Sequence, residues 1–155
     1  MKALVVFYSR TGNTKMIAES IADSLNCDIE EIEDSEKRSG IIGYIKSGYE
    51  AARDKLSVIK QPKYDPSQYE LLIIGTPVWA GKMAVPVKSY LEMNKDKIPL
   101  LACFCTCGNS GIDNTLKSIG EYVNITPMAS FGLNSSNIKN GEYSSVIEKF
   151  IQDLS

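Results

Sequence analysis

Apolar residues along this chain fall into two kinds of pattern, unbroken runs and helical stripes. Three runs, at 4–7, 71–74 and 100–104, show no alternation with polar residues. Unbroken runs are typical of strands in a parallel sheet that is covered on both faces. The segments 27–33 and 126–133 are more polar or are interrupted by proline and glycine, which predicts strands at the edges of the sheet.

Apolar residues spaced three or four positions apart predict helices between these strands. The stripe from Thr14 to Leu25 is continuous, and Pro86 suits the first turn of another helix. Shorter stripes cover 112–119 and 146–154, and one from Ile41 to Leu56 crosses a glycine-interrupted segment that leaves its start unfixed. Strands and helices therefore alternate, which predicts an α/β fold with a doubly wound, five-stranded parallel sheet and helices on both faces.

Length and composition add bounds to this picture. The chain has 155 residues, 43% of them hydrophobic, and we expect a single domain over 1–155. No apolar run approaches the roughly 20 residues that span a bilayer, and no signal segment precedes the first strand. Acidic residues gather at 19–36 and basic ones at 37–63, with a net charge of -2, which argues against nucleic-acid binding. We expect a cytoplasmic protein without membrane insertion.

The sequence contains no histidine. Its absence removes Ser-His and Cys-His nucleophile pairs, His-ligated zinc and the commonest general base. We therefore expect a cofactor, and no catalytic side chain, to supply the chemistry of this protein.

Three of the four cysteines, Cys103, Cys105 and Cys107, alternate along one predicted strand and its end. Alternate strand residues point the same way at intervals of about 6.6 Å. Zinc-bound thiolates must converge to about 2.3 Å from the metal, so we expect no metal site. Cys103 and Cys105 are better explained as small buried hydrophobic residues, whereas Cys107 lies in a loop and can touch a ligand.

The segment from Ser9 to Thr14 joins the first predicted strand to the first helix. It is rich in hydroxyl groups and contains no acidic residue. A loop of this kind directs backbone N–H and side-chain O–H groups to one point at the start of a helix, where an anion is favoured. Gly12 permits the close approach or positive φ that such loops often need. A simple N-capping turn is the alternative, but we favour a phosphate site.

Two further loops follow the third and fourth predicted strands. The first of them, 75–82, carries Trp79, the only tryptophan of the chain. Trp79 either fills the core or an interface, or contacts a planar ligand, and its place beside a phosphate loop favours the ligand. The second, 106–111, is small and polar, which suits hydrogen bonds to the edge of a flat ring. Ligands of doubly wound sheets bind beside such loops.

These residues resemble the flavodoxin-like family over essentially the whole chain, and its short-chain type in particular. Ser9-Arg10-Thr11-Gly12-Asn13-Thr14 is similar to the family's FMN phosphate loop, Ser/Thr-x-Thr-Gly-x-Thr. The resemblance implies a strand order of 2-1-3-4-5 and FMN as the cofactor. The cofactor-binding residues that it implies are Ser9, Arg10, Thr11, Gly12, Asn13, Thr14, Thr76, Pro77, Val78, Trp79, Ala80, Gly81, Thr106, Cys107, Gly108 and Asn109.

The resemblance implies electron transfer between redox partner proteins, a reductase and an acceptor, through the semiquinone and hydroquinone states of the flavin. It also leads us to expect that a backbone carbonyl near Ala80 and Gly81 accepts a hydrogen bond from the reduced ring.

The chain departs from the family in three ways. It is nearly neutral, its third loop has no aromatic residue, and Lys82 stands where a carboxylate is common. An open second ring face would suit the alternative function, an NAD(P)H- or quinone-dependent FMN oxidoreductase. A third possibility is a flavodoxin-like module that has lost its flavin and serves in protein interaction.

Overall fold

The computed structural model describes residues 1–35 and 56–155. The helix expected from the stripe between Ile41 and Leu56 falls on 36–55 and so lies outside the described residues. The rest of the chain forms a parallel sheet with helices on both faces.

The sheet has five parallel strands in the order β2-β1-β3-β5-β6. Their bounds are Ala3–Phe7 for β1, Asp28–Glu31 for β2, Leu71–Trp79 for β3, Leu100–Cys107 for β5 and Ser130–Asn134 for β6. This order is the predicted 2-1-3-4-5, with the predicted edge strands at the edges. A sixth, two-residue strand, β4 (Lys82–Met83), pairs antiparallel with the end of β3, and the sequence pattern did not predict it.

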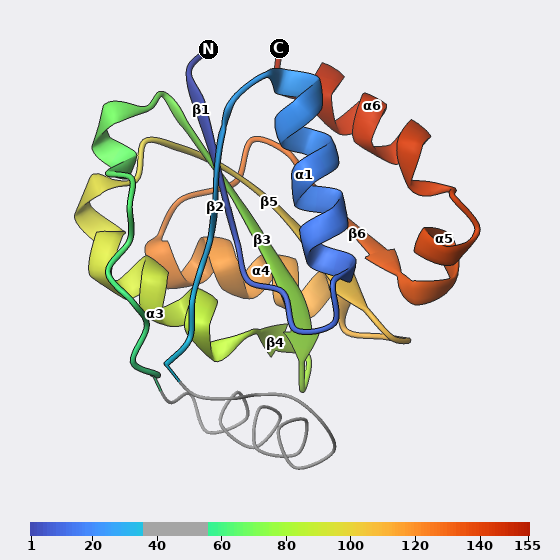
Figure 1. Ribbon diagram of the computed structural model, residues 1–155, viewed down its shortest axis with the longest axis horizontal. Coiled ribbons are helices and arrows are strands. Elements are labelled where there is room, and N and C mark those ends of the chain that lie inside the picture. Colours follow the sequence, from blue (N-terminus) through green and yellow to red (C-terminus); the bar gives the residue numbers. More distant parts are fainter. Residues whose placement is uncertain (36–55) are drawn as a thin grey trace.

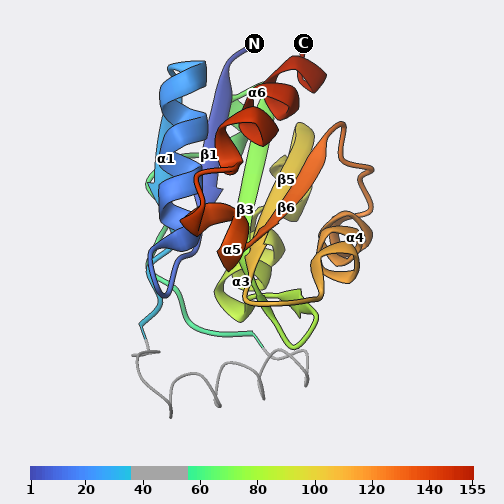
Figure 2. The ribbon, with the colours of Figure 1, turned by 90° about the vertical axis from the view of Figure 1, so that its right-hand side faces the viewer.

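Helices cover both faces of this sheet. Their bounds are Asn13–Leu25 for α1, Val85–Asn94 for α3, Ile112–Val123 for α4, Ser135–Lys139 for α5 and Tyr143–Asp153 for α6, and two short 3-10 helices, η1 and η2, span Pro66–Gln68 and Lys95–Lys97. Figure 2 shows α1 and α6 on one face and α4 on the other. The predicted stripes correspond to α1, α3, α4 and α6, and α5 is a short addition after β6.

The core explains why the strand sequences are unbroken apolar runs. Along β1, Leu4 and Val6 pack under α3 and α4, whereas Val5 and Phe7 pack under α1 and α6. Side chains of a strand alternate between faces, and here both faces are buried, so no position is left for a polar residue. In the adjacent β3, Gly75 gives room to Phe104, because a Cβ there would lie 2.2 Å from the ring.

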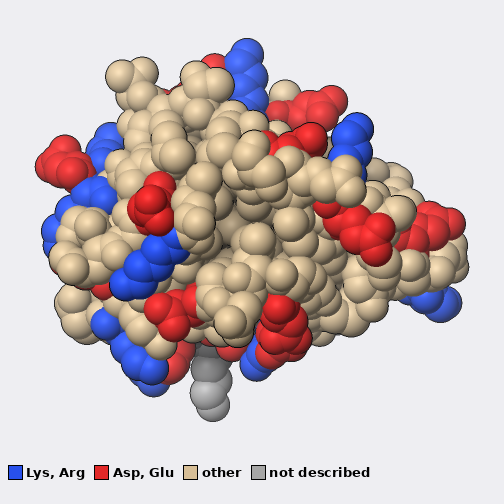
Figure 3. Space-filling view, turned by 90° about the horizontal axis from the view of Figure 1, so that it is seen from above, with Lys and Arg blue, Asp and Glu red and all other residues tan. Residues whose placement is uncertain are grey.

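The carboxyl ends of the parallel strands lie at one end of the molecule and both termini at the other (Figure 1). The view onto the terminal end shows Lys and Arg side chains interspersed with Asp and Glu (Figure 3). That end therefore presents no broad surface of a single charge, and the segments predicted to bind a ligand are at the opposite end.

Tyr90 of α3 supplies a test of the core. Its side chain is 1% exposed, and its hydroxyl has no hydrogen-bond partner in the part of the chain that the structure describes. Burial raises the pKa of this hydroxyl. A buried hydroxyl without a partner costs free energy that phenylalanine avoids.

We expect Tyr90→Phe to keep or raise the free energy of unfolding, by up to about 1 kcal/mol. As a matched control, Tyr69→Phe removes a 2.7 Å hydrogen bond donated to Asp28 and should lower it by about 1 kcal/mol. Because the folded pKa of Tyr90 is raised above 10.0, stability is lost as pH rises past about 10, and Tyr90→Phe should lose less. Urea unfolding at pH 7 and pH 10.5 measures both effects; a Tyr90→Phe variant less stable than Tyr69→Phe would contradict this description of the core.

Candidate functional site

The segment Ser9–Thr14 lies between the end of β1 and the start of α1. Gly12 is the N-cap of α1, with φ 100°, and its N–H donates to Ser9 Oγ at 3.1 Å. No side chain caps the first turn of α1, so the structure does not support the simple capping alternative. The helix start keeps backbone N–H groups that an anion can accept.

The end of β3 forms a hairpin, where a loop was expected. Ala80 and Gly81 make its two-residue turn with φ of 50° and 73°, which matches the twist of the paired strands but strains an alanine. The Thr76 hydroxyl holds the base of the hairpin: it accepts from the Ala84 N–H at 2.9 Å and donates to the Pro77 carbonyl at 2.8 Å. Thr76 is thus buried in the hairpin and acts there as a structural group.

The third segment is the end of β5, which runs through Thr106 and Cys107 before the chain turns at Gly108. Both side chains are buried, and burial raises the pKa of the Cys107 thiol. Cys107 is therefore a neutral thiol near pH 7. Its carbonyl accepts a hydrogen bond from Ser135 Oγ at 3.2 Å, which ties the end of β5 to the start of α5.

These three segments enclose one cavity of about 240 Å³. It is lined by Arg10, Thr11, Asn13, Thr14, Pro77, Val78, Trp79, Thr106, Cys107, Gly108 and Ser135. All but Ser135 belong to the predicted set. The predicted residues that do not line it are Ser9, Gly12, Thr76, Ala80, Gly81 and Asn109. Ser135 was missed because it follows an edge strand with no distinctive motif; only its place at the carboxyl edge of the sheet could have indicated it.

Trp79 belongs to both the core and the cavity. Its indole is 5% exposed and meets the Tyr8 ring edge to face, with centroids 5.4 Å apart. It also lines the cavity. The sequence left core filling and ligand contact as alternatives, and this geometry is compatible with both. The contact with Tyr8 packs the indole into the core and holds it in place, while the same indole forms part of the cavity wall.

The chemistry of the cavity lining fits a phosphate group. Thr11 and Thr14 contribute hydroxyls, Asn13 an amide and Arg10 a cation, and none of the described residues that line the cavity carries a carboxylate. Together with the start of α1, these donors suit an anion that only accepts hydrogen bonds. Pro77, Val78 and Trp79 form an apolar wall beside them.

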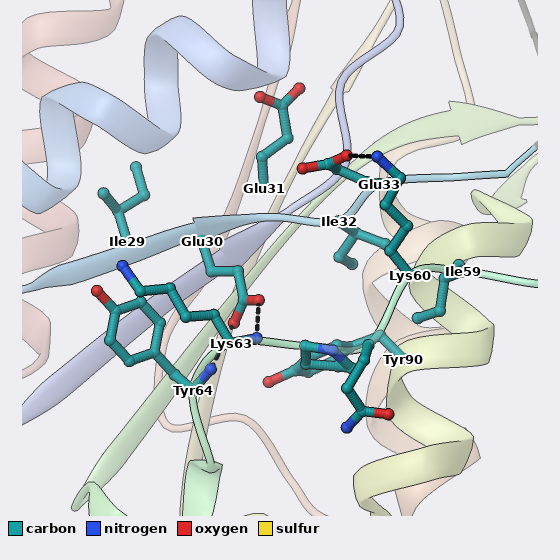
Figure 4. A pocket seen from close by; sticks show the side chains of 12 residues that line it. Ile29, Glu30, Glu31, Ile32, Glu33, Ile59, Lys60, Lys63, Tyr64 and Tyr90 are labelled. Atoms are coloured by element: carbon teal, nitrogen blue, oxygen red, sulfur yellow. Dashed lines mark hydrogen bonds and ion pairs between the residues drawn. The ribbon is translucent and has the colours of Figure 1, made fainter.

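A second cavity, of about 320 Å³, lies between β2 and the segment 59–64 (Figure 4). Three carboxylates line it, those of Glu30, Glu31 and Glu33, together with Lys60, which pairs with Glu33, and Lys63, so carboxylates outnumber cations. Glu30 accepts hydrogen bonds from the backbone N–H groups of Lys63 and Tyr64. This cavity is larger, but its carboxylates repel a phosphate, so the site between β1, β3 and β5 is the better candidate.

The cysteine prediction is confirmed for burial. Cys103 and Cys105 are fully buried, which raises the pKa of Cys103 to about 12 and raises that of Cys105 as well. Within residues 1–35 and 56–155, no group of His, Cys, Asp and Glu side chains could hold a metal ion.

Among the helices of those residues, none has both the length and the apolarity that crossing a membrane requires.

Comparison with known proteins identifies the family. The family model described as flavodoxin matches residues 2–149. The chain belongs to the flavodoxin family. This match confirms the resemblance that the phosphate loop indicated. FMN is the cofactor of this family. A search of curated proteins finds no match to this flavodoxin-family chain.

Solved structures share the fold. A flavoprotein of Lactobacillus acidophilus, in complex with FMN, is 23% identical with a TM-score of 0.73, and the match covers 90% of this chain and 97% of that chain. A flavoprotein of Bacteroides eggerthii is 21% identical with a TM-score of 0.70, covering 95% and 98%. The Trp repressor binding protein of Bacillus subtilis is 14% identical with a TM-score of 0.64, covering 97% and 98%. This flavodoxin-family chain therefore shares its fold with proteins of different description.

Gly108 supplies a test of the cavity. It lines the cavity, and a Cβ placed on it would meet no atom within 4 Å. Gly108→Val therefore adds side-chain atoms at the wall of the cavity, where no atom of the described residues has to move. We expect affinity for FMN to fall about tenfold or more, while the unfolding free energy of the ligand-free protein changes by about 0.5 kcal/mol at most.

Titration of FMN fluorescence and urea unfolding measure the two quantities. Gly108→Ala is the graded control and should show a smaller loss of affinity. Gly75→Ala is a control for damage to the fold. Its added Cβ would collide with Phe104, so this substitution should lower the free energy of unfolding. Unchanged FMN affinity in Gly108→Val would place the cofactor elsewhere.

Proposed function

We propose that this protein is an electron carrier that holds FMN in the cavity between β1, β3 and β5 and exchanges electrons with redox partner proteins, a reductase and an acceptor. The observation that carries the proposal is the chemistry of the cavity lining. Among residues 1–35 and 56–155, the lining offers hydroxyl, amide and guanidinium donors and an apolar wall, but no carboxylate, lysine or tyrosine, and the chain has no histidine. Such residues bind and orient a cofactor, and they leave redox chemistry to it.

The lining divides into two parts by chemistry. Thr11, Asn13, Thr14 and the start of α1 would hold the phosphate, with Arg10 as the neutralising charge. Trp79 would meet the ring on the hairpin side and Cys107 on the β5 side. When bound there, FMN supplies reversible one-electron and two-electron chemistry.

The hairpin turn supports a further role for backbone groups. Its tip lies against the start of α4, since a Cβ on Gly111 would be 2.8 Å from Val78 and 3.2 Å from the Gly81 Cα. This contact holds the turn at the edge of the cavity. A carbonyl of Ala80 or Gly81 remains our candidate acceptor for an N–H of the reduced ring.

One observation favours the second candidate function, an NAD(P)H- or quinone-dependent FMN oxidoreductase. Gly108 is exposed, and no atom of residues 1–35 or 56–155 lies within 4 Å of the place where its Cβ would be. The third segment therefore leaves room for a second planar molecule to stack.

Free cysteines at Cys27, Cys103, Cys105 and Cys107 support a cytoplasmic location for either function.

Purification and reduction distinguish these functions. A carrier should be yellow with bound FMN, show two separate one-electron potentials, and reduce an acceptor from NADPH only when a separate reductase is added. Rapid turnover of NADPH and a quinone by the protein alone would favour the enzyme. A colourless protein that does not bind added FMN would leave the interaction module as the remaining function.

Lys82 supplies a test of how the protein sets the potentials. It lies on β4, opposite Trp79 in the hairpin, and its positive charge favours negative charge on a reduced ring in the cavity. We expect Lys82→Glu to lower the second one-electron potential by tens of millivolts. Loss of the cation alone accounts for at most about 90 mV, or about 2 kcal/mol of Coulomb energy, and the added carboxylate accounts for at most as much again, before screening by salt and solvent.

Lys2→Glu is the matched control, because it makes the same charge change just before β1, at the opposite end of the sheet. It should leave both potentials unchanged. Potentiometric titration of the two variants measures the difference, and equal potentials in both would rule out a role for Lys82.

A further inference from the structure

A buried hydrogen bond links the first and third segments of the site. The Thr14 and Thr106 hydroxyls are 2.8 Å apart, and the two residues are separated by 92 positions in the chain. Thr14 is 2% exposed and Thr106 5% exposed, and both line the cavity. The pair therefore joins the first turn of α1 to the end of β5 at the wall of the cavity.

The number of protons in this pair points toward an acceptor in the cavity. Two hydroxyls have two protons, and their mutual hydrogen bond uses one, whichever of them donates. Elsewhere in the chain, helical serines donate to a carbonyl three or four residues before them, as Ser118 does to Thr115 and Ser20 does to Met16. Thr14 lies in the first turn, so residues 10 and 11 both precede the helix and its N-cap and offer no such helical carbonyl.

One O–H of the pair thus remains to be donated at the same place where the N–H groups of α1 begin. A phosphate oxygen only accepts hydrogen bonds, and a buried donor next to it forms a strong one. The edge of a flavin ring carries both donors and acceptors, so it does not specifically require an O–H donor at this position.

We propose that Thr106 is a positioning residue for phosphate binding: it fixes the Thr14 hydroxyl, and the pair donates one O–H to the phosphate of FMN. This assigns Thr106 to the phosphate, whereas the sequence suggested the edge of the ring. The inference rests on the proposed binding of FMN in this cavity.

The test compares ligands with and without the phosphate. We expect Thr106→Val to weaken FMN binding about tenfold and to leave binding of riboflavin, which has no phosphate, unchanged. Thr106→Ser keeps a hydroxyl and should restore most of the FMN affinity. Thr115→Val is the matched control, because Thr115 is a fully buried threonine on α4 that does not line the cavity.

Fluorescence titration gives the affinities. Competition by inorganic phosphate gives a second readout, because this competitor has no flavin ring and can bind only at the phosphate site. Thr106→Val should require more phosphate than the wild type to displace FMN to the same relative extent. Should Thr106→Val fail to fold, Thr106→Ala deletes the same hydroxyl with a smaller side chain.

The outcomes separate the two proposals. If the wild-type protein binds no FMN, the proposed function fails. If the wild type binds FMN and Thr106→Val weakens FMN and riboflavin equally, Thr106 acts at the ring and the present inference is overturned. Unchanged affinity for both ligands, or an equal loss in Thr115→Val, overturns it as well.

Discussion

The pairing of β3 with both β1 and β5 is the constraint on which the rest of the structure depends. Parallel register sets Phe7 beside Gly75 and Gly75 beside Phe104, so all three strands end at the same edge of the sheet. The residues proposed to bind the cofactor lie in the last residues of these strands or just after them. The pairing is possible because the strands are apolar on both faces, which lets α1 and α6 cover one side and α3 and α4 the other.

The strands, the main helices and most of the cavity could be predicted from the sequence because each has a local signal. Burial on both faces gives unbroken runs, and one-sided burial gives stripes such as that of α1. The hairpin after β3 could not be predicted, because its turn places Ala80 at φ 50°, where asparagine or glycine is the usual signal. Nor could the inward direction of the Thr76 hydroxyl, which depends on an N–H eight residues away.

The two cavities show how charge decides between sites of similar size. One of them is lined by more carboxylates than cations, and the Glu30 carboxylate there already accepts hydrogen bonds from the backbone N–H groups of Lys63 and Tyr64. In the other, most of the polar lining groups are neutral donors. Neutral donors bind a phosphate without placing additional full charges beside the ring, so a single cation in the lining, such as Arg10, would have a disproportionate influence on its potentials.

The same chemistry limits what the protein itself can do in a reaction. Proton transfer needs a group whose pKa lies near the ambient pH, yet burial moves the pKa of the Cys107 thiol upward and the other lining side chains are hydroxyls, amides, a guanidinium and apolar groups. Neither an electron nor a hydride requires a protein acid or base to reach a flavin. The choice between carrier and reductase therefore depends on which molecule the open side at Gly108 admits, a partner protein's cofactor at a distance or a planar substrate in contact, rather than on any catalytic side chain in the cavity.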